Sequence, residues 1–356
     1  MSGRALLYGV TGFTGREVAE RLRGLDIVVA GRDAAGVRAV AGTLGLSWRA
    51  FPLTDADVLD EALSDIDVVL HAAGPFEETA APMLQACLRT RTHYLDLNGE
   101  WPGFVDALVC DGALKAVGVM AMPGVGLTIV ATDCLLALAV ATWPDTVRVR
   151  LGVSQAQVVS RGSVASAARL LSPYVLVRRN GDLVSVPAGS LAHAFDFGEG
   201  LREAAAMSWA DVVTGPISTG VGDIEVYSEL GWPGRTSYRA SALAMSLTGP
   251  RGWRRAGEAL AAAWPKSPSG AMRERARFVM VVEALDAWRR PRHLRMRTFD
   301  GYTASVLTAA AAVRRVLAGD WSPGFQTPSL IFGPRFMLDE GAAELEAPFQ
   351  PAEACA

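Results

Sequence analysis

The feature that most constrains this sequence is a short apolar run leading directly into three glycines spaced three residues apart. The run Ala5–Tyr8 precedes Gly9, Gly12 and Gly15, and an amphipathic pattern follows. A strand that enters a helix here needs Gly9 for the sharp turn, Gly12 for close approach of a ligand and Gly15 for packing. A tight turn alone would explain two of the three glycines. Together with the helix N-terminus, which attracts anions, the spacing predicts a dinucleotide-binding loop. Its other expected contact residues are Thr11, Phe13 and Thr14.

The second apolar run bears on which dinucleotide is bound. Residues 26–30 end in Gly31-Arg32-Asp33. NAD enzymes place an acid at this strand end, whereas an arginine accommodates the 2′-phosphate of NADP. Arg32 therefore favours NADP(H) as the cofactor. The alternative is that Arg32 is a solvated loop residue, and in either case Asp33 can cap the next helix.

Strand and helix patterns alternate through residue 123, which predicts a parallel, doubly wound sheet with its ligand at the carboxyl ends of the strands. One expected helix covers residues 103–117 and ends at Gly118. The small residues after the fourth strand would let a cofactor pass close to the backbone. These expected cofactor contacts are Ala73, Gly74, Pro75 and Phe76.

A polar cluster follows the fifth expected strand, and it supplies the candidate catalytic residues. Strand alternation puts Tyr94 and Asp96 on one face, and Glu100 follows closely. Tyr94 is a candidate proton donor, and Asp96 or Glu100 would orient water or substrate. The alternative is structural, with Tyr94 packed in the core and Asp96 bonded to backbone amides.

Composition excludes several classes of protein. A net charge of −3 gives no electrostatic reason to expect nucleic acid or an anionic membrane as a partner. The four cysteines show no close pairing, and we expect a cytoplasmic protein with reduced thiols. The four histidines lack metal-ligand spacing, so we expect no metal. The apolar segment 118–143 is long enough to span a membrane, but Pro123-Gly124 divides it, which favours a buried strand, turn and helix.

The pattern changes from about residue 145. Residues 146–153 alternate apolar and polar side chains, and Asn180-Gly181 between two strand patterns predicts a hairpin. A helix is expected from Ser163 to Leu171. This region therefore predicts an α+β domain with an antiparallel sheet. Its apolar strands 147–153 and 278–282 would otherwise be exposed, so we expect a homodimer.

An ordered set of short segments resembles the saccharopine dehydrogenase-like oxidoreductases, and in particular the trans-acting enoyl reductases among them. The set spans residues 9 to about 333: the three-glycine loop, Ala30-Gly31-Arg32, Ala73–Phe76, Thr92–Glu100, Pro123–Gly126, Ser160–Ser163 and Gly324–Pro328.

This resemblance implies an α/β fold, with a Rossmann-like domain formed by residues 1–125 plus about 300–340. Residues 126–299 would be an inserted α+β domain for substrate and dimerisation. It also implies NADPH-dependent hydride transfer to an activated C=C bond of a polyketide, lipid or other carrier-bound or small-molecule intermediate. Two alternatives remain: C=N reduction of the saccharopine type, with substrate carboxylates held by arginines such as Arg161, Arg169, Arg273 and Arg275, or NADP(H) binding without turnover.

Overall fold

A computed structural model describes residues 3–154, 172–230, 236, 238–239, 277–298 and 301–349. The expected helix 163–171, the Ser160–Ser163 segment and the four named arginines lie outside these residues. The chain divides into two compact units. The first contains Met1–Val130 and Tyr302–Ala342, and the second contains Ala131–Gly301 and Ala343–Ala356.

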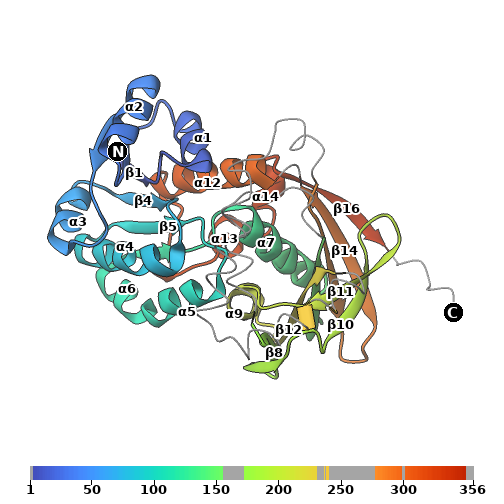
Figure 1. The fold of residues 1–356 in the computed structure, drawn as a ribbon. Helices are drawn as coiled ribbons and strands as arrows, with labels where there is room; N and C mark the ends of the chain where they lie inside the picture. The colour runs from blue at the N-terminus through green and yellow to red at the C-terminus, as the bar shows by residue number, and fades with distance from the viewer. Residues whose placement is uncertain are drawn as a thin grey trace. The chain divides into compact units, whose positions relative to one another are not determined.

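The described part of the first unit is built on a parallel sheet of seven strands (Figure 1). The strand order is β15-β6-β5-β4-β1-β2-β3, and every neighbouring pair is parallel. The order reverses direction between β1 and β4, which is the switch point where such sheets bind ligands. The strands are β1 (Ala5–Tyr8), β2 (Ile27–Gly31), β3 (Ser47–Ala50), β4 (Val68–His71), β5 (His93–Asp96), β6 (Met120–Met122) and β15 (Gly324–Phe325).

Helices cover both faces of this sheet. In Figure 1, α1, α2 and α12 lie on one side of the central strands and α3 to α6 on the other. Their bounds are α1 (Phe13–Arg21), α2 (Ala34–Leu44), α3 (Ala56–Leu63), α4 (Phe76–Thr90), α5 (Trp101–Val109), α6 (Asp111–Val117) and α12 (Gly301–Leu317). The short helices α13 (Pro328–Phe332) and α14 (Phe336–Asp339) follow β15.

The central strands are apolar along their whole length because both faces are covered. All four residues of β1 and all four of β4 are buried. Leu7 lies between Val29 on β2 and Leu70 on β4. This continuous burial explains why these strands show no alternation in the sequence.

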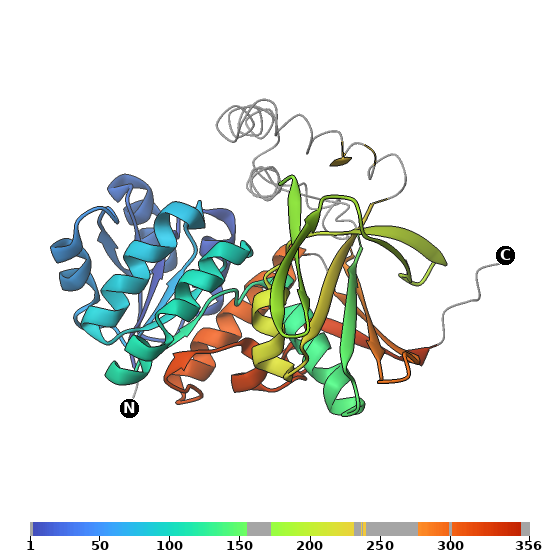
Figure 2. The same ribbon diagram turned by 90° about the horizontal axis from the view of Figure 1, so that it is seen from below.

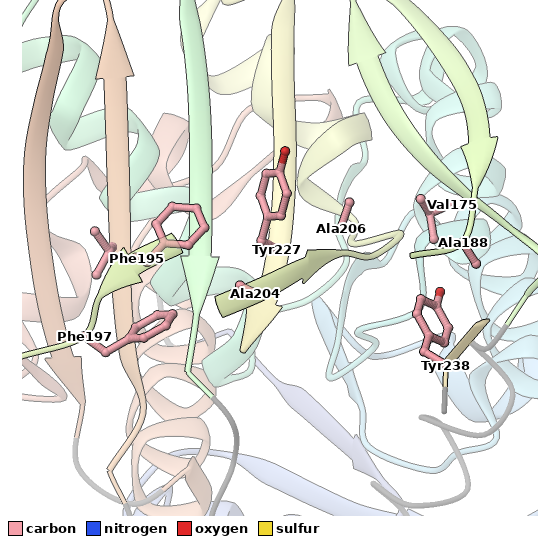
Figure 3. Packing of buried hydrophobic residues seen from close by; sticks show 9 residues of the cluster. Val175, Ala188, Phe195, Phe197, Ala204, Ala206, Tyr227 and Tyr238 are labelled. Carbon is pink, nitrogen blue, oxygen red and sulfur yellow. The ribbon is translucent and has the colours of Figure 1, made fainter. Parts of the chain in front are cut away.

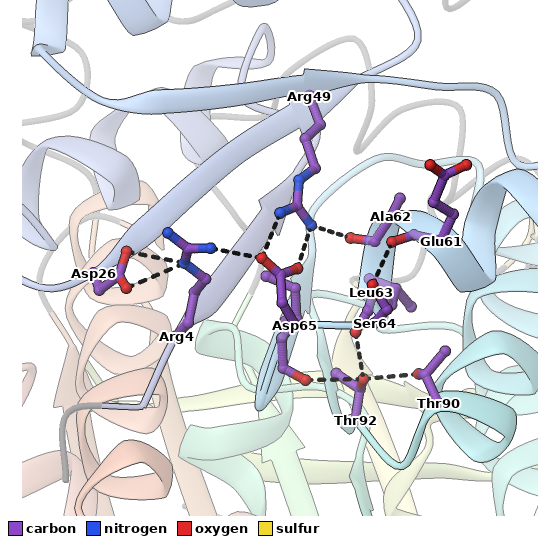
Figure 4. A network of polar contacts seen from close by, with 11 residues as sticks. Arg4, Asp26, Arg49, Glu61, Ala62, Leu63, Ser64, Asp65, Thr90 and Thr92 are labelled. Atoms are coloured by element: carbon purple, nitrogen blue, oxygen red, sulfur yellow. Dashed lines mark hydrogen bonds and ion pairs between the residues drawn. The ribbon is translucent and has the colours of Figure 1, made fainter.

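A group of ion pairs lies at the amino ends of the central strands, on the side of the sheet opposite the carboxyl ends (Figure 4). Arg4 bonds Asp26 and Asp65, and Arg49 also bonds Asp65. The Arg49 guanidinium holds the pKa of Asp65 well below its usual range. Because these groups are partly exposed, each pair adds only modest stability. Their effect is to fix the start of β1 against the segments that precede β2 and β4.

The second unit contains a nine-stranded sheet in its described part, the green to red arrows of Figure 2. Its order is β10-β11-β12-β7-β13-β14-β16, and the β8–β9 hairpin pairs with β12. The strands are β7 (Arg148–Val153), β8 (Tyr174–Arg179), β9 (Asp182–Pro187), β10 (Ala192–Asp196), β11 (Leu201–Ala206), β12 (Asp223–Glu229), β13 (Val279–Leu285), β14 (Pro291–Thr298) and β16 (Ala343–Phe349). Among the described residues, helix α9 (Asp211–Thr219) lies in this unit, and helix α7 (Leu127–Thr142) begins in the first unit and continues into the second.

The fold class predicted from the sequence is confirmed, with one correction. The second sheet is mixed rather than purely antiparallel, because β7 and β12 run parallel from Arg148↔Asp223 to Val153↔Ser228. The alternation of β7 reflects burial and not strand direction, so the sequence could not reveal this pairing. The hairpin at Asn180-Gly181 is confirmed between β8 and β9. The expected single helix 103–117 is two helices, α5 and α6, joined at Cys110.

One hydrophobic cluster of the second unit packs around β7, β10 and β12 (Figure 3). Phe195 of β10 packs over Gly152 of β7, where a Cβ atom would lie 2.5 Å from its ring. Tyr227 and Val281, the neighbours of Gly152 on either side, belong to the same cluster. This cluster covers the face of β7 that carries Gly152. Val149, Leu151 and Val153, which alternate onto the opposite face, are also at most 3% exposed within the chain.

Candidate functional site

The candidate site lies along the carboxyl edge of the first unit's sheet, where the loops after β1, β2, β4, β5 and β6 meet. The glycine loop after β1 has the geometry that its spacing predicts. Gly9 has φ +105°, and a Cβ atom there would lie 2.7 Å from the carbonyl carbon of Ala72. A Cβ atom at Gly15 would collide with the carbonyl oxygen of Gly9, so α1 packs directly on the turn. Gly9 and Gly15 are thus required by packing within the unit.

The middle of the loop is open instead. Thr11, Gly12 and Phe13 are exposed, and Thr14 is half-buried. Gly12 is the N-cap of α1 and has no side chain to occupy the first-turn N–H groups. A helix N-terminus left in this state binds phosphate through these N–H groups and the helix dipole.

The loop after β2 places a positive charge beside the glycine loop. Arg32 is exposed, and its charge acts on the hydroxyl of Tyr8, the last residue of β1. Asp33 is the N-cap of α2, although its carboxylate bonds no first-turn N–H of that helix. That carboxylate lies over Gly36, where a Cβ atom would be 2.6 Å from Oδ2. The Asp33 carboxylate is thus turned toward α2, and the contact of Arg32 with a 2′-phosphate stays a prediction.

The loop after β4 carries the second group of expected cofactor contacts. Gly74 is exposed, and Ala73, Pro75 and Phe76 are half-buried. Phe76 is the first residue of α4, with Pro75 as the N-cap. This loop touches the glycine loop directly, because Gly9 packs on Ala72 and Ala73.

Strand β5 and the loop after it contain the three candidate catalytic residues, with Tyr94 and Asp96 on the strand and Glu100 at the end of the loop. The Tyr94 hydroxyl donates to Asp96 Oδ2 at 2.7 Å, and both side chains are 1% exposed. Asp96 Oδ1 accepts the N–H of Asn98 at 2.9 Å and that of Gly124 at 2.7 Å. Burial raises the pKa of Asp96 to about 6, against the lowering effect of these bonds. Tyr94 and Asp96 thus lie on one face, as alternation predicts, and they join the loops after β5 and β6.

Glu100 lies at the rim of this cluster. It is 8% exposed and is the N-cap of α5, and its backbone N–H donates to the side chain of Asn98 at 2.8 Å. Nothing in this geometry tests a catalytic role for Tyr94, Asp96 or Glu100, which stays a prediction. The structure does give the first two a structural task, since three hydrogen bonds converge on one buried carboxylate.

Two contacts at this edge had no signal in the sequence. The ring of Tyr302, from the returning helix α12, packs edge-on against Phe13 with centroids 5.6 Å apart. His71, the last residue of β4, lies in contact with both Tyr8 and Phe76. The contacts Phe13–Tyr302 and Tyr8–His71 join segments distant in sequence, which only the folded unit brings together.

Two features are absent from the described residues. No helix in this part of the chain is long and apolar enough to cross a membrane. Within the same residues, no group of three or more His, Cys, Asp or Glu side chains is arranged to hold a metal ion.

The sequence comparisons concern the first unit. Residues 5–110 match the family model of the saccharopine dehydrogenase NADP binding domain. The trans-acting enoyl reductase of Mycobacterium leprae is 38% identical over 104 residues, which are 27% of this chain and 25% of that protein. The Mycobacterium ulcerans enzyme of the same name is 36% identical over the same shares. The match therefore spans only a quarter of the length of these relatives.

Solved structures show the same fold over nearly the whole chain. Apo saccharopine dehydrogenase (L-Glu forming) from Saccharomyces cerevisiae covers 97% of this chain and is itself covered completely, with a TM-score of 0.63 and 14% identity. Homospermidine synthase from Legionella pneumophila, solved in complex with NAD, covers 97% of this chain and is covered over 92%, with a TM-score of 0.65 and 8% identity. At these identities the likeness shows the fold alone.

The fold and the open glycine loop define the class, a nicotinamide-dinucleotide-binding protein with a Rossmann-like domain. The family match is confined to the first unit: residues 5–110 are similar to the saccharopine dehydrogenase NADP binding domain, so this unit carries an NADP-binding domain of that type.

Proposed function

We propose that this protein is an NADPH-dependent reductase that transfers hydride to an activated C=C bond of a carrier-bound or small-molecule intermediate, such as one of polyketide or lipid type. The observation that carries the cofactor part is Arg32, exposed at the end of β2 beside the open N-terminus of α1. A guanidinium in this place pairs with the 2′-phosphate that NADPH has and NADH lacks.

The choice of C=C over C=N is supported by the names of the relatives matched in sequence, which are trans-acting enoyl reductases. The saccharopine dehydrogenase neighbour, at 14% identity, supports only the shared fold. In the proposed reaction the nicotinamide supplies the hydride. The candidates for handling the proton are Tyr94, Asp96 and Glu100, with Tyr94 and Asp96 also holding the loops after β5 and β6 in place.

The cofactor assignment is tested by titrating NADPH and NADH and following nicotinamide fluorescence. Replacing Arg32 with alanine removes a charge-assisted contact, so NADPH binding should weaken by about 1.5–3 kcal/mol while NADH binding changes little. Arg23→Ala is a matched control, because Arg23 is an exposed arginine that follows α1 and precedes β2, at the opposite edge of the sheet. Equal affinity of the wild-type protein for the two cofactors would contradict the role given to Arg32.

The reaction type is tested by NADPH oxidation with a short enoyl thioester and, separately, with an α-keto acid plus an amino acid, which together form an imine. Turnover of the thioester alone supports C=C reduction. Turnover of the imine alone would indicate C=N reduction of the saccharopine type instead. Tight NADPH binding with neither activity would favour NADP(H) binding without turnover.

A homodimer and a cytoplasmic location remain proposals. The residues that suggested the dimer now support it less, because Val149, Leu151 and Val153 are at most 3% exposed within the chain. Sedimentation equilibrium gives the answer directly, with 37.7 kDa expected for the monomer and twice that mass for the dimer.

A further inference from the structure

His71 holds a central position at the candidate site although it is not exposed there. It ends β4 between β1 and β5: the N–H of Ala72 donates to Tyr8 O at 2.8 Å, and the N–H of Leu97 donates to His71 O at 3.2 Å. This is the switch point of the sheet, where the glycine loop and the Ala73–Phe76 loop meet.

The imidazole is connected to that second loop by hydrogen bonds. His71 Nε2 lies 2.9 Å from Thr79 Oγ1. Thr79 Oγ1 in turn lies 2.7 Å from Ala73 O and 2.9 Å from Pro75 O. Carbonyl oxygens only accept, so the hydroxyl hydrogen of Thr79 is directed to them and its oxygen accepts from His71 Nε2–H. The chain of bonds thus runs from the end of β4 to two carbonyls of the loop.

Ring packing adds a second connection. The His71 ring meets Phe76 edge-on, with centroids 5.5 Å apart and an interplanar angle of 88°. On its other side it contacts Tyr8 at 5.7 Å. His71 therefore touches the last residue of β1 and the first residue of α4, and it fixes the ring of Phe76 relative to the glycine loop.

The environment excludes a role in acid–base chemistry. His71 is fully buried, and burial lowers its pKa to about 3. Among the described residues none donates to Nδ1, which agrees with a neutral ring that carries its proton on Nε2. A neutral imidazole out of contact with solvent does not exchange protons with a substrate, so its contribution must pass through its neighbours.

We propose that His71 is a positioning residue which, through Thr79 and Phe76, holds the Ala73–Phe76 loop in the shape that receives the nicotinamide half of the cofactor. This inference rests on the proposed NADPH function. In a doubly wound sheet the two halves of the dinucleotide lie on opposite sides of the switch point. The loops after β1 and β2 then serve the pyrophosphate and adenosine half, and the loop after β4 serves the nicotinamide half.

The experiment compares NADPH with 2′,5′-ADP, which contains only the adenosine half and its 2′-phosphate. The side-chain amide nitrogen of glutamine reaches the place of Nε2 and can donate to Thr79, whereas that of asparagine reaches only the place of Nδ1. We expect His71→Asn and Thr79→Val to weaken NADPH binding roughly three- to tenfold and to alter the emission of bound nicotinamide. His71→Gln keeps the bond to Thr79 but loses the ring contact with Phe76, so it should weaken NADPH binding less than His71→Asn does, and 2′,5′-ADP affinity should stay constant throughout.

Thr92→Val is the matched control. Its hydroxyl is also buried and donates to Ile66 O at 3.0 Å, but it lies before β5, at the edge opposite the candidate site (Figure 4). This variant should lose stability and keep NADPH affinity. Unchanged NADPH binding in Thr79→Val, or equal losses for NADPH and 2′,5′-ADP, would overturn the inference. A wild-type protein that binds 2′,5′-ADP and not NADPH would overturn the proposed reductase function itself.

Discussion

Asp211 is the buried group of the second unit whose ionisation should be visible in stability. It begins α9 and is fully buried, and burial, followed by the charge of nearby Asp133, raises its pKa to about 7. Asp133 itself accepts a hydrogen bond from Ser218 of the same helix. An aspartate with a raised pKa binds its proton more tightly in the folded state. Its contribution to stability is fully present below pH 4 and is lost as the pH rises to about 7.

Asp211→Asn should therefore stabilise the protein at pH 8 by about 2–4 kcal/mol, with the gain disappearing by pH 4. Because the asparagine cannot ionise, the free energy of unfolding should change less with pH between pH 4 and pH 8. Urea unfolding of the wild type and the variant at a series of pH values measures this difference in the free energy of unfolding. Thr214→Val provides the control, since Thr214 is buried on the same helix and carries no charge at any pH. A gain that is the same at pH 4 and pH 8 would show that Asp211 does not titrate in this range.

At the same scale, the sequence predicted which residues gather at the site but not how their polar atoms are used. Alternation along β5 placed Tyr94 and Asp96 on one face, and their hydrogen bond confirms this. The bond from Gly124 to Asp96 joins positions 28 residues apart, so it depends on the pairing of β5 with β6. His71 could be considered only as a metal ligand, because its partner Thr79 is defined by the start of α4.

At the level of elements, the glycine loop contains glycines required by packing and one, Gly12, that we expect to matter for binding instead. A methyl group at Gly15 would collide with backbone, whereas one at Gly12 meets only Gly9 O at 3.3 Å, on an exposed loop with φ −76°. Gly15→Ala should lower stability by about 1–3 kcal/mol through overpacking. Gly12→Ala should keep the midpoint of thermal unfolding within about 2 °C of the wild-type value. It should weaken NADPH binding, because its methyl group would lie where the pyrophosphate is expected. Thermal unfolding and NADPH titration of the two variants measure this, and similar effects of both on stability would refute the distinction.

The elements that the sequence predicted well are those determined by local pattern. The buried strands of the first unit, the loop at Gly9 and the hairpin at Asn180-Gly181 all follow from short runs of residues. The pairing between strands distant in the sequence was not predicted. β7 and β12 are parallel neighbours although about 70 residues separate them, and no turn between them sets their direction. The break at Cys110 also escaped prediction, because a continuous apolar face covers both α5 and α6.

At the scale of the whole molecule, the chain contains two compact units, each with its own buried core. The predicted cofactor contacts Gly9–Gly15, Arg32 and Ala73–Phe76 all belong to the first unit, and Asp211 belongs to the second. A ligand stabilises only the part of a protein whose unfolding releases it. NADPH and the Asp211→Asn substitution should therefore act on different units.

Differential scanning calorimetry at pH 8 tests this division. Because each unit has a separate core, we expect two transitions rather than one. NADPH at one hundred times its dissociation constant should stabilise one unit by about 2.7 kcal/mol and raise the midpoint of that transition alone. Asp211→Asn should raise the midpoint of the second unit's transition. Arg32→Ala should reduce the shift that NADPH causes in the first unit's transition and leave the second unit's transition unchanged. If instead NADPH and Asp211→Asn move a single transition together, the two units unfold as one cooperative body, and the cofactor stabilises the second unit as strongly as the first.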